Sequence, residues 1–271
     1  MKKQMMNCSD EHLVFLKKRR LRIALVWTLR IGVLALLLGL WELSTYLGWA
    51  DPFLVSSPSR VAKTLKSLYD EGTLFFHIGT TLWETVVGFV LAVVLGYGIA
   101  LLLWWSELVR NVLEPYIVVL NALPKIALGP LIIIWFGTGS KAILFMTVIV
   151  GLIVAIMHML TAFIATDKNK MLLLKSMGAS KLQILLKLVI PSSLASFISM
   201  LKVNVGMAWI GSIMGEYIVS KAGLGYLIVY GGQVFKLDLL MTSTIILSVL
   251  AAVMYFLVVL LEKILVKNAE S

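Results

Sequence analysis

Six long apolar stretches restrict what this chain can fold into more than any other feature. They lie at residues 23–43, 78–105, 112–135, 142–165, 191–214 and 239–261. An α-helix needs roughly 20 mostly apolar residues to cross the hydrocarbon layer of a bilayer. Backbone groups in lipid must be satisfied internally, and the runs are too unbroken for the alternating strands of a membrane barrel. The pattern therefore predicts an all-α membrane protein with about six transmembrane helices.

The bulk composition agrees with a chain that is largely solvated by lipid. Of the 271 residues, 60% are hydrophobic and 14% are charged, and the mean hydropathy is +0.98. A soluble domain is roughly half apolar and about a quarter charged. The formal net charge is +10, but the basic residues cluster beside apolar runs and form no groove with interleaved aromatics. We therefore expect membrane lipid, and no nucleic acid, among the partners.

Lysine and arginine are distributed unequally between the two sides that six spans create. Residues 1–22 carry seven of them and the segment between the fourth and fifth spans carries five, against six on the whole opposite side. The positive-inside rule places both termini in the cytoplasm. The first apolar run is too long for a signal peptide and lacks a clear cleavage site. We expect a cytoplasmic N-terminal tail at 1–22 and a single transmembrane domain at 23–271.

Proline interrupts the third stretch, 112–135, more than any other. Pro115, Pro124 and Pro130 all lie within it. Proline lacks a backbone N–H and its ring clashes with the preceding helical turn. This span is therefore predicted to be kinked or broken.

The cytoplasmic segment 166–190 has the local signals of two short helices joined by a turn. Asp167 is a suitable N-cap, and Gly178 follows where a helix end needs a left-handed residue. Ser180 with Gln183 three residues later has the spacing of a capping box. The sequence predicts a helix-turn-helix loop that leads directly into the fifth span.

The first helix of this loop also carries an apolar patch, Met171 to Leu174 with Met177, among lysines. An exposed apolar patch in water usually has a partner, such as the groove of a cytoplasmic protein. The same residues could instead pack on the ends of the chain's own helices or on the lipid surface. The residues alone leave both alternatives open.

Residues of the types that usually take part in catalysis or metal binding are few. The single cysteine, Cys8, excludes an intramolecular disulfide and a thiolate metal site. His12, His77 and His158 are scattered, and His158 is expected to be a satisfied interior side chain of the fourth span. The sequence has no phosphate-binding glycine loop, nucleophile elbow or zinc-protease motif. We expect no enzymatic activity and no metal or cofactor bound by this chain.

A few charged residues lie within or beside the apolar spans. Charges at membrane depth are costly and often face a cavity or a pathway. Lys125, Lys202 and Glu216 are therefore candidates for lining a pathway. Pairing or snorkelling is the competing explanation for Lys202, and an interfacial position is the competing explanation for Glu216. For Glu84, as for Lys202, the alternatives are lining a pathway and being paired or snorkelling.

Several motifs together resemble one protein family. In the cytoplasmic loop, Gly178 is followed after nine residues by Leu188-Val189-Ile190-Pro191, which resembles the EAA loop of binding-protein-dependent ABC importer permeases. Further motifs look like the nitrate/sulfonate/taurine-type subfamily, and they are Asn121-Ala122-Leu123-Pro124-Lys125, Trp135-Phe136-Gly137-Thr138-Gly139, Gly215-Glu216-Tyr217 and Gly223-Leu224-Gly225-Tyr226-Leu227.

The resemblance implies a type I importer transmembrane domain in a bacterial inner or plasma membrane. Two permease copies would form the pathway, two separate ATPase subunits would bind ATP and magnesium, and a periplasmic or lipid-anchored binding protein would deliver the solute. The residues implied to dock on the ATPase are Leu172, Leu173, Leu174, Met177, Gly178, Ala179, Ser180, Leu182 and Pro191. One departure is clear, because the family's Glu-Ala-Ala falls on the three leucines 172–174.

The subfamily implies a small and anionic solute, such as a sulfonate, taurine or nitrate. Related permeases also serve thiamine precursors and other small molecules. Two other classes compete with this interpretation: a secondary transporter, which would need an ion-coupling site, and a membrane adaptor that only recruits a partner through its apolar loop. Association with an ATPase distinguishes the three.

Overall fold

The computed structural model describes residues 10–267, whose regular secondary structure is entirely helical, with no strand among them. The chain divides into two compact units, Met1–Lys63 and Thr64–Ser271. The sequence places only residues 1–22 outside the transmembrane domain, and that boundary stays a prediction.

The first unit is dominated by one long helix. Helix α1 spans Asp10–Tyr46 and therefore begins well before the predicted span at 23–43. Helix α2, Pro52–Val55, starts at Asp51, whose side chain accepts a hydrogen bond from the Phe53 N–H at 2.8 Å. Helix α3, Pro58–Asp70, follows it and crosses the boundary into the second unit.

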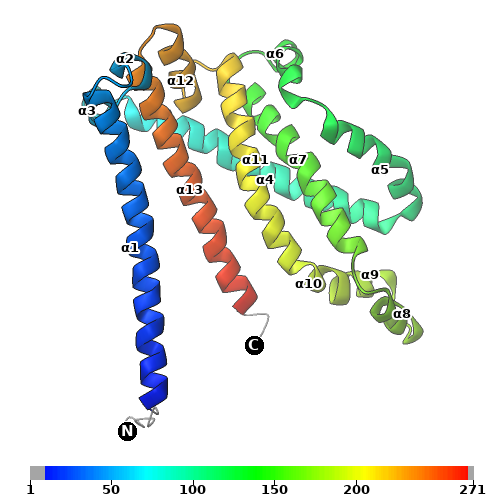
Figure 1. Cartoon of the computed structure of the whole chain (residues 1–271). Coiled ribbons are helices and arrows are strands. Elements are labelled where there is room, and N and C mark those ends of the chain that lie inside the picture. The colour runs from blue at the N-terminus through cyan, green and yellow to red at the C-terminus, as the bar shows by residue number, and fades with distance from the viewer. Residues whose placement is uncertain (1–9, 268–271) are drawn as a thin grey trace. The chain divides into compact units, whose positions relative to one another are not determined.

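Four long helices form the body of the second unit (Figure 1). They are α4 (Leu74–Trp105), α7 (Ser140–Ile164), α11 (Leu194–Val219) and α13 (Leu237–Lys267). Helix α7 packs along both α4 and α11. A Cβ on Gly88 would lie 2.6 Å from the Cβ of Thr147, so glycine at this position lets α4 and α7 approach closely.

The proline-rich third stretch is broken, as predicted. Helix α5 (Glu107–Ala122) is followed by the short 3₁₀ helix η1 (Lys125–Leu128) and by α6 (Gly129–Phe136), and the two arms differ in direction by 90°. The break falls at Pro124, because proline biases the preceding residue away from helical geometry. By length and hydropathy, the described residues contain five candidate spans, or up to six if this bent pair is counted as one.

Short helices connect these long ones. The loop between α7 and α11 contains α8 (Lys168–Ser176), α9 (Lys181–Ile184), the π-helical turn η2 (Leu185–Val189) and α10 (Ile190–Ser192). Helix α12 (Leu224–Gln233) lies between α11 and α13. The fifth span is observed as α11, 194–219, a few residues later than the predicted 191–214.

The core of the second unit lies between α4, α7 and α11. Phe163, Met159 and Val189 are fully buried there. Tyr97 of α4 makes edge-on ring contacts with Phe163 at 5.6 Å and with Phe197 at 5.5 Å. Large apolar side chains also cover the outer faces of the long helices. Such exposure is unusual for a soluble monomer and normal for helices that face lipid.

Candidate functional site

The loop between α7 and α11 begins with a capped helix. The Asp167 side chain accepts a hydrogen bond from the Asn169 N–H at 2.8 Å, which satisfies one of the free donors at the start of α8. The predicted start of the first loop helix is therefore confirmed.

Gly178 ends this helix in the left-handed region, with φ of +84°. Its N–H donates to the Lys175 carbonyl at 3.0 Å, and the Ala179 N–H donates to the Leu174 carbonyl at 3.0 Å. These two bonds define a Schellman motif. A Cβ at Gly178 would meet no atom within 4 Å, so backbone conformation, and not crowding, favours glycine at this position.

The second loop helix has the predicted capping box. The Ser180 hydroxyl accepts from the Gln183 N–H at 3.3 Å, and the Gln183 side chain accepts from the Ser180 N–H at 2.8 Å. The turn between α8 and α9 is therefore held on both sides by local hydrogen bonds.

The second loop helix continues almost without interruption into α11. The π-helical turn η2 is closed by the Ile190 N–H, which bonds to the Leu185 carbonyl. Pro191 follows in the first turn of α10, where a missing N–H is tolerated. Because only Ser193 separates α10 from α11, a nearly continuous helical path connects α9 to α11.

The apolar patch of the loop divides into an inner and an outer face. Met171, Leu174 and Ala179 pack against the buried core of the unit. The outer residues remain exposed, with the exposed fractions 63% for Leu172, 61% for Leu173, 75% for Met177 and 53% for Leu182. The sequence left open whether these apolar residues pack on the chain itself or are free to meet a partner, and the structure shows that different residues do each.

Lys181 fixes the loop to the end of α4, a contact that the sequence analysis missed. Its ammonium group donates to the backbone carbonyl of Trp105 and lies over the rings of Trp104 and Trp105, at 5.7 and 5.4 Å from their centres. Trp105 is the last residue of α4, where free carbonyls favour a cation. The adjacent pair Trp104-Trp105 at the end of an apolar stretch was the only sequence signal for this contact.

The two candidate lysines each have a defined partner. The Lys125 ammonium donates to the Asn121 carbonyl at 3.1 Å, across the break between α5 and η1. The Lys202 ammonium pairs with Glu262 of α13 at 2.7 Å. Pairing was the competing explanation for Lys202, and it is the arrangement that the structure contains.

Glu216 is buried inside the helix bundle. One carboxyl oxygen accepts from the Thr81 hydroxyl of α4 at 2.6 Å, and the other accepts from the Gly225 N–H at 2.5 Å. Thr81 in turn accepts from the Leu224 N–H at 2.8 Å. The carboxyl group therefore joins α4 and α11 to the first turn of α12, where N–H groups favour an acceptor.

The glycines at the start of α12 make room for this carboxyl group. A Cβ on Gly225 would lie 2.7 Å from Glu216 Oε2, and a Cβ on Gly223 would also collide with the carboxyl group. This close contact explains why glycine occupies both ends of the Gly223-Leu224-Gly225 motif, since a larger residue would collide with the carboxyl group. Glu84 of α4 is buried beside Glu216, and its Oε2 atom has no hydrogen-bond partner among the described residues.

Comparisons with known proteins agree on one kind of transporter component. A family model described as "Binding-protein-dependent transport system inner membrane component" matches residues 88–270. A probable ABC transporter permease protein of Haemophilus influenzae is 30% identical, covering 83% of this chain and 91% of the relative.

Two further relatives are named for the solutes that they transport. The formylaminopyrimidine transport permease protein ThiX of Halalkalibacterium halodurans is 31% identical, covering 70% of this chain and 76% of the relative. The taurine transport system permease protein TauC of Escherichia coli is 25% identical and covers 83% of both chains.

The fold is similar to that of a solved importer. An inward-facing structure of the MetNI methionine ABC transporter matches with a TM-score of 0.63 and 17% identity, covering 73% of this chain and 96% of that one. The similarity confirms the predicted type I transmembrane architecture. Proteins of this kind are transport components that work with an ATPase and a substrate-binding protein, and no enzymatic family is indicated. The match over residues 88–270 and these relatives show that the chain belongs to the family of binding-protein-dependent inner membrane components, as the permease subunit of an ABC importer.

Proposed function

We propose that this permease subunit moves a small anionic solute of the sulfonate, taurine or nitrate class across the cell membrane. The taurine relative, similar over most of both chains, supports this class. The formylaminopyrimidine relative has the higher identity, 31% against 25%, and it makes a thiamine precursor the second candidate.

The exposed face of the α8–α9 loop is proposed to be the docking surface for the ATPase. This proposal rests on the exposure of four apolar side chains whose neighbours Met171, Leu174 and Ala179 pack against the core. The four are Leu172, Leu173, Met177 and Leu182. Fully burying a leucine or methionine side chain is worth about 1.5–3 kcal/mol. Leucines at 172–174 cannot dock through a carboxylate, so apolar burial would supply most of the contact energy.

Coupling is proposed to follow the helical path from this surface to α11. Docked ATPase subunits that close around ATP would displace α8 and α9, and the displacement would continue through η2 and α10 into α11. The switch works only if ATP binds the closed state more tightly than the open one.

A second copy of the chain is proposed to complete the pathway. The break between α5 and η1 leaves irregular backbone at Leu123 and Pro124, inside a stretch of membrane-spanning length. Irregular backbone at membrane depth is tolerated only against protein or a water-filled cavity. A partner permease on this side would supply that cover. With both termini in the cytoplasm, as the lysine and arginine distribution favours, the docking loop would also lie in the cytoplasm.

The proposal is tested by purifying the permease with its ATPase and measuring hydrolysis and solute uptake. Replacing Leu172 and Leu173 by serine should reduce ATPase recovery at least about tenfold, because two apolar contacts are removed. The control Leu108→Ser changes a leucine that is 76% exposed at the start of α5, and it should leave recovery unchanged.

Uptake of radiolabelled taurine and nitrate, each competed with formylaminopyrimidine, then separates the two solute classes. Transport of the pyrimidine alone would refute the anionic class. Solute movement without an ATPase would support the secondary transporter, and ATPase recruitment without any transport would support the adaptor.

A further inference from the structure

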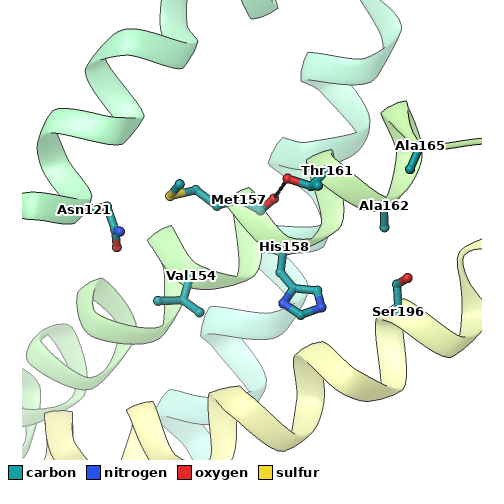
Figure 2. Close-up of a pocket in the computed structure, with 8 residues that line it drawn as sticks. All are labelled: Asn121, Val154, Met157, His158, Thr161, Ala162, Ala165 and Ser196. Atoms are coloured by element: carbon teal, nitrogen blue, oxygen red, sulfur yellow. Dashed lines mark hydrogen bonds between the residues drawn. The ribbon is translucent and has the colours of Figure 1, made fainter.

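A pocket of about 480 Å³ lies between α5, α7 and α11, away from the docking loop surface. Figure 2 shows Asn121 on α5, His158 on α7 and Ser196 on α11 around it. Val154, Met157, Ala162 and other small apolar groups form the remaining walls. Pockets of roughly 300–1,000 Å³ with apolar walls and a few polar groups are typical of small-molecule sites.

The polar side chains of this pocket are available to a ligand. Thr161 is the exception, because its hydroxyl donates to the Met157 carbonyl at 2.8 Å, the bond drawn in Figure 2. Within residues 10–267, no hydrogen bond engages the side chains of Asn121, His158 or Ser196. The expectation that His158 is a satisfied interior histidine is therefore wrong: it is half-buried and faces the pocket (Figure 2).

The lining of the pocket suits a negatively charged ligand, because it contains hydrogen-bond donors and no aspartate or glutamate. Lys125 is not a lining residue, but its ammonium donates to the backbone carbonyl of Asn121, a residue of the pocket wall, at 3.1 Å. The amide of Asn121, a ring N–H of His158 and the hydroxyl of Ser196 can all donate to an oxyanion. Their combination suits a small solute with an anionic head and a short apolar body.

Three different helices meet at this pocket, and two of them bear on transport. Helix α5 ends one residue after Asn121, directly before the 90° break. Helix α11 is the helix into which the docking loop leads, and Ser196 lies in its first turn. A displacement of α11 would therefore change the distance between Ser196 and His158.

We propose that this pocket is a solute-contact site on the transport pathway, where Asn121, His158 and Ser196 donate hydrogen bonds to the oxyanion of the solute. The inference rests on the proposed anionic class and deepens it by naming the residues that meet the solute inside the membrane. Movement of α11 would bring these donors together and separate them again in step with the ATPase cycle.

Charged thiol reagents test the site without any need for transport. A His158→Cys chain that also carries Cys8→Ser has one thiol, so labelling reports only the pocket. Each rate is first divided by the rate of the same reagent with a small free thiol, because a thiolate attracts the cationic reagent. On this normalised scale a sulfonate-bearing methanethiosulfonate should react at least about threefold faster than its trimethylammonium analogue, because Lys125 favours the anion. The preference should fall in the presence of Lys125→Gln, and Thr244→Cys on α13 should show none.

The result that overturns the site is an unreactive thiol in the His158→Cys chain, which means that lipid or a second copy fills the pocket. Equal rates for the two reagents, or a faster cation, overturn the anion preference. Neither outcome depends on whether the chain associates with an ATPase, so failure of the site and failure of the proposed function remain distinguishable.

Transport assays give the second readout. In the complete transporter, combined Asn121→Ala and His158→Ala should lower taurine uptake per ATP hydrolysed at least about tenfold while hydrolysis stimulated by the loaded binding protein persists. Thr244→Val is the control, because Thr244 lies on α13, is not part of the pocket lining, and donates its hydroxyl to the carbonyl four residues earlier. This control should retain uptake, and unchanged uptake in the Asn121/His158 variant would overturn the proposal.

Discussion

Replacing Glu216 by glutamine tests whether its hydrogen bonds hold α12 to the bundle. The carboxyl group accepts from Thr81 and from the Gly225 N–H, and both donors are buried. A glutamine can accept only one of these bonds and turns an NH₂ group toward the other donor. Losing a bond costs about 1 kcal/mol, and a buried unsatisfied donor costs about 1–3 kcal/mol more. We therefore expect a loss of about 2–4 kcal/mol in the free energy of unfolding.

The measurement is equilibrium unfolding of the purified permease by SDS in mixed micelles, followed by tryptophan fluorescence. Glu107→Gln is the control, because Glu107 is exposed and makes only a surface pair with Arg110 at 3.3 Å. That substitution should change the free energy by less than about 0.5 kcal/mol. If Glu216→Gln is as stable as the control variant, the network does not stabilise this region and the reasoning fails.

A double-mutant cycle separates the hydrogen bonds from the packing. Gly225→Ala places a Cβ 2.7 Å from Glu216 Oε2 and should cost about 1–3 kcal/mol in the native chain. A Glu216→Ala background removes the contact with Oε2 and leaves the contact with the Cβ of residue 216 at 2.9 Å. The same substitution should therefore cost less in that background, by at least about 0.5 kcal/mol. Equal costs in both backgrounds would show that the two residues are not coupled.

Substitutions at three further positions probe the loop and the buried carboxyl pair. Gly178→Val should reduce ATP-coupled uptake strongly while Gly178→Asn retains most of it, because asparagine tolerates positive φ and valine does not; equal uptake by both would contradict this. Lys181→Met should lower the protection of the loop in hydrogen exchange, because it removes the bond to Trp105, and an unchanged exchange pattern would argue against the anchor. Glu84→Gln should leave SDS stability unchanged or raise it by about 1 kcal/mol, since Glu84 has an unpartnered oxygen beside Glu216; a loss comparable to that of Glu216→Gln would contradict this assignment.

Features governed by neighbours in sequence could be predicted from the sequence. The caps at Asp167 and Ser180 and the turn at Gly178 each depend on residues within about five positions. Their hydrogen bonds form in almost any tertiary context, so residue type and spacing are sufficient to predict them. The three prolines of 112–135 predicted a kink or break in that span but did not say at which proline, since Pro115 lies inside α5 and the break falls at Pro124.

Contacts between distant helices could not be derived in this way. Thr81 and Glu216 are 135 residues apart, and Lys181 meets a carbonyl 76 residues earlier. Nothing local identifies such partners, because the pairing depends on which helix faces which. The pocket around His158 was missed for the same reason, since its polar side chains come from three different helices.

The division of the α8 patch into an inner and an outer face also bears on how fast a partner can bind. A segment that must fold on its partner loses conformational freedom at that moment, and this loss reduces its affinity. Here Met171 and Leu174 already anchor the helix in the free chain, and the turn at Gly178 is already closed. The outer leucines are therefore presented on a preorganised surface. Association should resemble rigid docking, limited by the rate of encounter rather than by a folding step.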